Sequence, residues 1–242
     1  MNRVAIIQAR MTSTRLPGKV LADIGGEPML ARQIARLRRA QRLDSIAIAT
    51  TRETTDDPVA ALGRTLGLDV YRGDEHNVLS RYAAAAKETR ADLVVRVTGD
   101  CPLIAPEIVD AVVTRIESTL CDYASNTLRR TYPRGLDVEA LHLDVLLRME
   151  RLAASHLARE HVTYFLHTER PDLFLAVSVE DSSDNSDLRW TVDTPADLMA
   201  VRAIYAALRP NPTEATYRST LDVVRRTPEI ARINASVEQE KP

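Results

Sequence analysis

The sequence predicts an α/β fold in which helices cover both faces of a doubly wound, mostly parallel sheet. Over the first half of the chain, short apolar runs alternate with amphipathic helical segments, which is typical of parallel strands joined by crossover helices. The segment 122–187 then changes character and carries a polar, basic cluster, so we expect a small antiparallel insertion there. A chain of 242 residues with 45% hydrophobic residues can bury the core of one large domain, and we assign residues 1–242 to a single domain.

Each element is predicted from its own periodicity. Apolar or alternating runs predict strands at 4–7, 45–50, 69–71, 93–97 and 188–193. Helical spacing predicts helices within 29–40, 54–66, 77–91, 106–118 and 157–164, from 194 onward, and over 217–234 with a break at Pro228. The tail 238–242 is expected to fray. Ligands of such folds bind beyond the carboxyl ends of the strands, so polar residues at those ends are the candidate site.

Bulk properties exclude several classes of protein. The formal net charge of -2 argues against a general nucleic-acid binder, so any basic site is local. We see no signal peptide, and no apolar run approaches the roughly 18 residues of a membrane span. Cys101 and Cys121 lack metal-ligand spacing and give no reason to expect a disulfide, which indicates a reducing cytoplasm.

Residues 8–19, Gln-Ala-Arg-Met-Thr-Ser-Thr-Arg-Leu-Pro-Gly-Lys, follow the first predicted strand as a loop. Arg10, Arg15 and Lys19 fall within it, Ser13 is a small donor, and Gly18 allows close backbone approach. Guanidinium groups pair bidentately with phosphate and an ammonium acts as a point charge, so the loop suits a triphosphate. A solvated basic loop is the alternative.

A second candidate follows the strand at 93–97. Gly99-Asp100-Cys101-Pro102 ends the strand and leaves the Asp100 carboxylate projecting from its end. A carboxylate so placed can bind a hard divalent cation that also takes phosphate oxygens. The alternative is an aspartate that caps a helix or turn.

The loop 8–19 resembles the signature loop of nucleotidyltransferases related to the acylneuraminate and 3-deoxy-manno-octulosonate cytidylyltransferases. It is most similar to the subfamily of spore coat polysaccharide biosynthesis protein F. The resemblance covers nearly the whole chain, with four further motifs that begin at Gly73 (Gly-x-x-x-x-Val-Leu-x-Arg-Tyr), Pro133 (Pro-x-Gly-Leu-Asp-Val-Glu), Arg159 (Arg-Glu-His-Val-Thr) and Val192 (Val-Asp-Thr-Pro-x-Asp-Leu).

The resemblance implies a GT-A-like fold, CTP and Mg²⁺ as ligands, and a homodimer built through the insertion 122–187. It implies catalytic roles for Lys19, Arg10 and Asp100, and makes Asp193 the second metal ligand beside Asp100. The implied nucleotide-binding residues are Gln8, Ala9, Arg10, Ser13, Arg15, Lys19, Thr50, Arg72, Gly73 and Thr98. The implied acceptor-binding residues are Asn126, Arg134, Asp137, Glu139, Glu160 and His161.

Structural alternatives stay open for several of these residues. Asp193 or Thr194 can cap the helix that follows, and Asn77 can be a helix N-cap. Arg134 can be a gatekeeper on a solvated strand edge, and His161 lacks a second ligand at metal spacing, which favours a structural histidine.

The predicted activity is transfer of CMP from CTP to an anionic small molecule, namely an acidic sugar, sugar phosphate or phosphonate, with release of pyrophosphate. The sequence offers no clear general base, which mildly favours an acceptor that is already ionised. Two alternatives are a nucleotide-sugar-dependent glycosyltransferase and a non-catalytic nucleotide-binding partner. The dense cationic loop argues against the first, and intact Lys19, Asp100 and Asp193 argue against the second.

Overall fold

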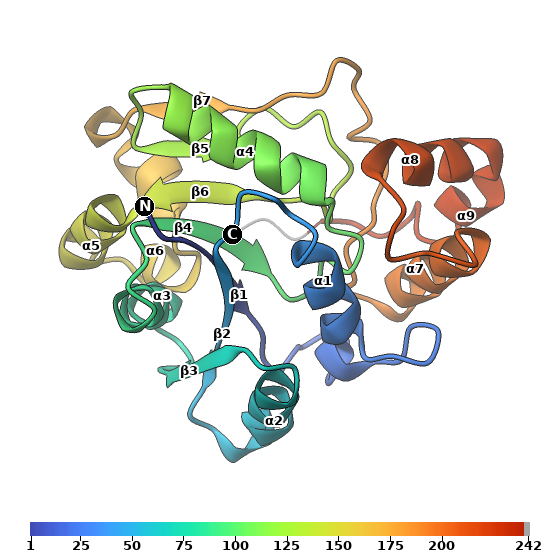
Figure 1. Ribbon diagram of the computed structural model, residues 1–242, viewed down its shortest axis with the longest axis horizontal. Helices are drawn as coiled ribbons and strands as arrows, with labels where there is room; N and C mark the ends of the chain where they lie inside the picture. The colour runs from blue at the N-terminus through green and yellow to red at the C-terminus, as the bar shows by residue number, and fades with distance from the viewer. Residues whose placement is uncertain (240–242) are drawn as a thin grey trace.

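A seven-stranded sheet forms the centre of the computed structural model, which describes residues 1–239 (Figure 1). The strand order is β3-β2-β1-β4-β6-β5-β7. The first four strands are parallel to one another: β1 (Arg3–Gln8), β2 (Ser45–Thr51), β3 (Asp69–Gly73) and β4 (Leu93–Thr98). The predicted doubly wound, mostly parallel α/β fold is confirmed.

The segment 122–187 extends the same sheet with three short strands. β6 (Glu139–His142) runs antiparallel to both of its neighbours, β4 and β5 (Tyr123–Ser125). β7 (Ala176–Ser178) then pairs in parallel with β5 at the edge. β6 is therefore the strand that reverses direction within this sheet.

Helices cover both faces of the sheet because its central strands are apolar on both sides. In β1, Ala5 and Ile7 pack on one face and Val4 and Ile6 on the other. The first face is covered by α1 (Met29–Leu37), α2 (Asp57–Thr65) and α4 (Pro106–Ser118). α7 (Pro195–Ala207), α8 (Tyr217–Arg226) and α9 (Pro228–Arg232) join the same core cluster and lie together at one end of the sheet (Figure 1). The second is covered by α3 (Val78–Glu88), α5 (Leu143–Leu152) and α6 (His156–Glu160).

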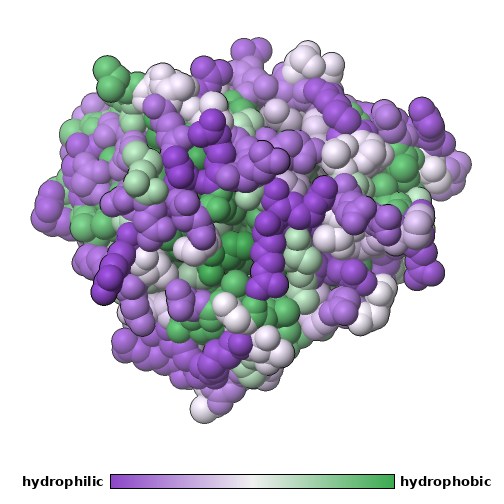
Figure 2. Space-filling model, in the orientation of Figure 1, coloured by the Kyte–Doolittle hydropathy of each residue, from purple (hydrophilic) through white to green (hydrophobic). Residues whose placement is uncertain are grey.

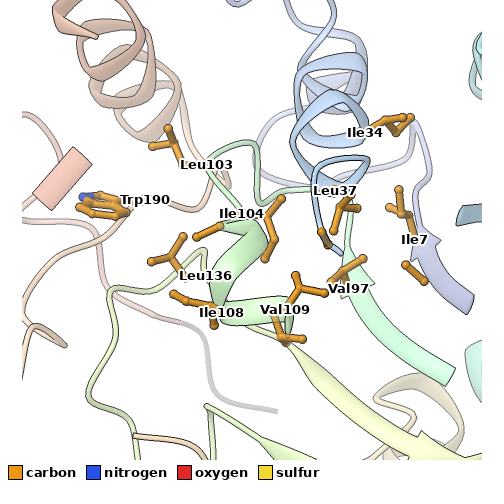
Figure 3. Close-up of a cluster of buried hydrophobic side chains, with 14 of the residues drawn as sticks. Ile7, Ile34, Leu37, Val97, Leu103, Ile104, Ile108, Val109, Leu136 and Trp190 are labelled. Carbon is orange, nitrogen blue, oxygen red and sulfur yellow. The ribbon is translucent and has the colours of Figure 1, made fainter. Parts of the chain in front are cut away.

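The larger core cluster extends from the sheet to the C-terminal helices. Figure 3 shows Ile7 and Val97 of the sheet beside Leu37 of α1, while Trp190 and Leu136 lie toward α7 at the other end. This core fixes the segment that follows Leu188 against the rest of the domain.

The predicted strand at 188–193 is wrong. The segment is extended, but it forms only an isolated bridge between Arg134 and Arg189. Gly135 allows the close contact between these two segments: it has a φ of +99°, and a Cβ there would lie 2.3 Å from the Thr191 nitrogen. The two segments therefore meet at one point and do not run side by side.

Other boundaries shift by a few residues. The helix predicted at 157–164 ends at Glu160, and Val162 follows with a φ of 46° before a wide turn at Phe165–Glu169. The break at Pro228 is confirmed between α8 and α9. The predicted frayed tail 238–242 falls mostly outside the described residues.

The face in Figure 2 is mostly hydrophilic, with apolar side chains gathered near its middle. Within residues 1–239, no helix combines the length and apolar character needed to cross a bilayer. Cys101 and Cys121 are both free.

Candidate active site

The loop after β1 is held in a fixed shape by its own backbone and by one buried carboxylate. Gly18 has a φ of +74°, and its N–H donates to the Met11 carbonyl at 2.9 Å. Fully buried Asp56 accepts the Met11 N–H at 2.6 Å and also binds the Thr51 hydroxyl of β2. The loop is therefore anchored to the sheet, and its cationic side chains are placed before any ligand arrives.

The loop and the end of β4 enclose a cavity of about 210 Å³. It is lined by Gln8, Ala9, Arg10, Ser13, Thr14, Arg15, Lys19, Val20, Thr98, Gly99 and Asp100. Every one of these residues lies at the carboxyl ends of β1 and β4 or in the loop between β1 and α1, which is where the fold class predicts a ligand.

Lys19 lies between two carboxylates at this cavity. Its Nζ is 3.3 Å from Oδ2 of Asp100 and 2.8 Å from Oδ1 of Asp193, and it donates to the Val192 carbonyl at 2.8 Å. Burial alone would lower the pKa of Lys19, but Asp100 and Asp193 outweigh this and raise it. Burial would likewise raise the pKa of Asp100, but Lys19 and the Thr98 hydroxyl hold it below its usual value. Lys19 and Asp100 are therefore both charged at neutral pH.

Asp193 reaches the site through backbone contacts rather than through a strand. The Asp100 carbonyl accepts the Val192 N–H at 2.9 Å and the Thr191 hydroxyl at 3.2 Å. These bonds join the end of β4 to the segment that carries Asp193. Residues separated by more than ninety positions in the sequence are thereby brought to one lysine.

The two aspartates fit a divalent cation. Both carboxylates are turned toward the same ammonium group, so the position between them already holds a positive charge. Carboxylate oxygens are the ligands that Mg²⁺ prefers, and Mg²⁺ keeps several water or phosphate ligands besides one or two carboxylates. In residues 1–239 no group of three or more His, Cys, Asp or Glu side chains meets at metal-binding distance, so the remaining ligands would come from phosphate or water.

Arg10 and Arg15 flank this centre. Arg15 Nη2 is 3.3 Å from Oδ2 of Asp193, and Arg10 Nη1 is 3.6 Å from Oε1 of Glu75. Their side chains are 38% (Arg10) and 27% (Arg15) exposed, so both remain reachable from the cavity.

Three predicted nucleotide residues lie away from the cavity. Thr50 is fully buried in β2. Arg72 binds the Thr51 and Glu53 carbonyls and Asp57, and Gly73 leaves room for the side chain of Arg81, whose Cγ would lie 2.9 Å from a Cβ there. Asn77 caps α3, accepting the Ser80 N–H at 3.0 Å, as the structural alternative predicts.

A second cavity, of about 160 Å³, adjoins the first. It is lined by Gln8, Ala9, Arg10, Val78, Arg81, Glu160 and His161. Gln8, Ala9 and Arg10 therefore line both cavities. Burial lowers the pKa of His161, so its imidazole is neutral at pH 7. The structure thus brings two predicted acceptor residues, Glu160 and His161, beside the predicted nucleotide residues.

The other predicted acceptor residues are engaged within the protein or lie elsewhere. Asn126 is fully buried and binds the Leu136 carbonyl and the Val138 N–H. Asp137 forms a bidentate pair with Arg130 at 2.6 and 2.8 Å. Glu139 binds Arg96 at 2.9 Å and the Thr163 hydroxyl at 3.1 Å.

Arg134 lines a third cavity, of about 170 Å³, together with Arg189. Burial lowers the pKa of Arg134, and the positive charges of Arg130 and Arg189 act in the same direction. An anion in this cavity would relieve that accumulation of positive charge.

Sequence reasoning missed Gly99, Arg96 and Arg189. A Cβ at Gly99 would lie 2.9 Å from the Gln8 carbonyl oxygen, so glycine allows β4 to end against β1. Arg96 lies within an apolar strand. Because a buried charge must be paired, an arginine at such a position predicts a buried acidic or polar partner. Nothing in the local sequence identifies the partners of Arg189.

Comparisons with known proteins show the family to which the chain belongs. A family model described as Cytidylyltransferase matches residues 4–221. The chain is 30% identical over 233 residues to the spore coat polysaccharide biosynthesis protein SpsF of Bacillus subtilis, covering 93% of this chain and 95% of that protein. It is 38% identical to a 3-deoxy-manno-octulosonate cytidylyltransferase of Anaeromyxobacter dehalogenans, covering 86% of this chain and 99% of that protein.

Among solved structures, a cytidylyltransferase from Leptospira borgpetersenii matches with a TM-score of 0.91 and 29% identity, covering 100% of this chain and 99% of that chain. The family model spans the loop after β1 and both aspartates that contact Lys19. The two relatives match over 93% and 86% of this chain. The chain therefore belongs to the cytidylyltransferase family.

Proposed function

We propose that the protein transfers CMP from CTP to an acidic sugar, with Mg²⁺ bound and pyrophosphate released. The observation that carries this proposal is the position of Lys19, whose ammonium lies between the carboxylates of Asp100 and Asp193 at the cavity formed by the loop after β1. The names of the relatives, which include 3-deoxy-manno-octulosonate cytidylyltransferases, support CTP and an acidic sugar.

In this proposal Arg10, Arg15 and Lys19 bind the oxygens of the triphosphate. An acceptor oxygen forms a bond to the α-phosphorus, and a hydroxyl acceptor gives up its proton to solvent water. The bond from that phosphorus to the bridging oxygen of the β-phosphate breaks, and pyrophosphate leaves with the electron pair. Asp100 and Asp193 would hold Mg²⁺, which when bound neutralises charge on the transferred phosphate and the leaving group. The chain itself contributes positioning and charge, and no covalent intermediate is required.

Lys19 has two roles in succession. Without ligands it neutralises the two carboxylates; with the cation in place its ammonium can turn to the phosphates instead. This exchange needs no movement of the backbone, because Lys19 Nζ is at the end of a flexible side chain that lines the cavity.

We place the acceptor in the second cavity, beside Gln8, Ala9 and Arg10. The carboxylate of Glu160 can accept hydrogen bonds from sugar hydroxyls, and the neutral imidazole of His161 can donate one and accept one. Arg10, shared by both cavities, can meet a carboxylate of the acceptor.

Arg134 lies outside this second cavity, and the family resemblance alone assigns it to the acceptor side of the proposal. We expect Arg134→Ala to raise the acceptor KM about tenfold, the equivalent of one hydrogen bond to a charged group, with a smaller effect on the KM for CTP. Arg129→Ala is the matched control, because the Arg129 side chain is 79% exposed and pairs with Glu180 at the surface. Equal effects of the two substitutions would assign Arg134 a structural role.

Pyrophosphate release tests the reaction directly. The assay combines Mg²⁺, each of the four common nucleoside triphosphates, and a panel of keto-acid sugars, sugar phosphates and phosphonates. We expect release with CTP and one acidic acceptor, and none after Asp100→Asn. Turnover of a nucleoside diphosphate sugar without pyrophosphate release would favour a glycosyltransferase. If no nucleotide and acceptor give pyrophosphate, and CTP does not raise the Tm, a non-catalytic protein is favoured.

Two further parts of the proposal concern assembly and location. We infer a homodimer that pairs through the segment 122–187, supported by the family resemblance; light scattering of the purified protein would reveal a monomer if this is wrong. A cytoplasmic location is supported by the two free cysteines.

A further inference from the structure

Arg189 connects the carboxylate of Asp193 to the C-terminal part of the chain. Its Nη2 donates to Oδ2 of Asp193 at 2.7 Å. Its Nε and Nη2 also bind the two carboxylate oxygens of Asp197, at 2.8 and 3.1 Å. The Arg189 side chain is only 8% exposed, so these bonds form with little competition from water.

Asp197 is fully buried and is itself fixed from several directions. It completes a capping box with Thr194 at the start of α7, and its Oδ2 accepts the N–H groups of Asp193 and Thr194 at 3.0 Å. Its Oδ1 accepts Nδ2 of Asn234 at 2.8 Å. Asp197 therefore cannot move without disrupting the beginning of the helix.

The C-terminal segment closes on Arg189 from the other side. Asn234, which is 3% exposed, follows α9 and donates to the Arg189 carbonyl at 3.1 Å as well as to Asp197. Oε1 of Gln239 accepts from Nη1 of Arg189 at 2.6 Å. Both residues lie beyond position 221, where the match to the family model ends.

This arrangement divides the two oxygens of Asp193 between two tasks. Oδ2 is held by Arg189 and Arg15, while Oδ1 faces Lys19 Nζ at 2.8 Å, on the side toward Asp100. Without the bonds to Oδ2, the carboxylate could rotate and present either oxygen. Outer partners that orient ligating carboxylates commonly change metal affinity by about 10–100-fold when they are removed.

We propose that Arg189 is a positioning residue, supported by Asp197 and by Asn234 of the C-terminal segment, that holds one oxygen of Asp193 toward the cation. The inference rests on the proposed function, because it assigns Asp193 to the divalent cation. It goes beyond that function because Asn234, which follows the end of the family match at residue 221, helps to orient the Asp193 carboxylate.

The test measures binding of Mn²⁺ to the full chain in the presence of CTP and absence of acceptor, by the loss of the free-Mn²⁺ paramagnetic resonance signal. Arg189→Gln removes the bidentate pair. We expect Mn²⁺ affinity to fall about tenfold or more in Arg189→Gln and less in Asn234→Leu. In the pyrophosphate-release assay, we expect the kcat of these variants to fall at low Mg²⁺ and to recover in part at high Mg²⁺.

Arg225→Gln is the matched control. Arg225 forms a comparable bidentate pair with Asp187, at 2.7 Å on both sides, and binds Oδ1 of Asn185, but it does not contact Asp193 or Asp197. We expect this substitution to lower Tm without changing Mn²⁺ affinity. Asn234→Leu keeps the Arg189–Asp197 pair and serves as the second variant should Arg189→Gln not fold.

Wild-type Mn²⁺ affinity in both Arg189→Gln and Asn234→Leu would overturn the positioning role, as would an equal loss in Arg225→Gln. Failure of the proposed function has a different signature: the unsubstituted protein would release no pyrophosphate with any acceptor. The ratio of variant to wild-type Mn²⁺ affinity reports on the positioning role even when turnover is absent, and a wild-type protein that binds no Mn²⁺ would overturn both.

Discussion

Two mostly buried cations near the carboxyl ends of neighbouring strands differ in how their charge is matched. Lys19 contacts two carboxylates and lines a cavity, whereas Arg96 pairs with one carboxylate, Glu139, and one amide oxygen, that of Gln8 at 3.1 Å. Arg96 also lies 5.6 Å from the centre of the Tyr82 ring. Burial would lower the pKa of both cations, and in both their acidic neighbours raise it instead.

The direction of the pKa therefore does not distinguish a functional cation from a structural one. What distinguishes them is access and the number of anionic partners. Lys19 contacts two carboxylates and lines the cavity, so an incoming cation can replace it there. Arg96 has one matching partner and lies outside the cavity lining, so its pairing serves the fold.

The largest expected effect follows from the functional side of this comparison. We expect Lys19→Ala to reduce turnover by about 10³-fold, because it removes a preorganised charge from the phosphate site. In the presence of Mg²⁺ the Tm should stay nearly unchanged, since the divalent cation neutralises Asp100 and Asp193 in place of the ammonium. Pyrophosphate release and scanning calorimetry measure the two quantities, and wild-type turnover would remove the assigned role.

The structural side predicts the reverse pattern for Arg96. Arg96→Met leaves Glu139 buried without its partner, which should lower the free energy of unfolding by about 3–5 kcal/mol. Urea unfolding measures this, and turnover per folded molecule should change far less than in Lys19→Ala. The double variant Arg96→Met/Glu139→Gln should recover part of the loss, because the unpaired charge is gone. A stable Arg96→Met protein with no turnover would reverse the comparison and place Arg96 in the active site.

The parallel half of the fold was predictable because each strand there is a separate apolar run bounded by polar residues. The runs at 4–7, 45–50 and 93–97 correspond to β1, β2 and β4 with shifts of one residue at their ends. β5 and β7 have three residues each, too few for a periodic signal, and they exist because β6 and β5 provide partners. The extended segment at 188–193 has strand-like alternation but lacks a neighbouring strand to pair with.

The candidate site likewise contains residues whose positions the sequence predicts and residues whose positions it does not. The cavity-lining residues of the loop 8–19, together with Thr98 and Asp100, lie next to strand ends that the sequence reveals, and the structure brings them together. Thr50 and Arg72 also lie near the carboxyl ends of their strands. However, Thr50 is buried and Arg72 binds backbone carbonyls, an outcome that only side-chain packing decides. The pair of Arg96 with Glu139 joins residues 43 positions apart, and the contact of Arg189 with Asn234 joins residues 45 positions apart. No pattern in the local sequence predicts contacts between residues so far apart.

The smallest expected effect comes from removing the hydroxyl of Tyr82 while keeping its ring. The Tyr82 hydroxyl donates to the carbonyls of Ile6 (3.1 Å) and Val97 (3.0 Å), and burial raises its pKa to about 12. The unfolded chain ionises this phenol near pH ~10, so the folded protein binds the proton more tightly. The stability that this provides is complete below pH ~10 and is lost as the pH rises toward about 12.

Tyr82→Phe should therefore cost about 1 kcal/mol at neutral pH and make the fall in stability between pH ~10 and ~12 less steep. Turnover should be unchanged, because the ring that packs against Arg96 is kept. Tyr205→Phe is the matched control: its pKa is also raised to about 12 by burial, and its hydroxyl donates to the Pro102 carbonyl, but it has no contact with Arg96. Urea unfolding at several pH values should give similar slopes for the two variants. A large loss of turnover in Tyr82→Phe alone would mean that the Arg96 region is tuned for catalysis and not only for stability.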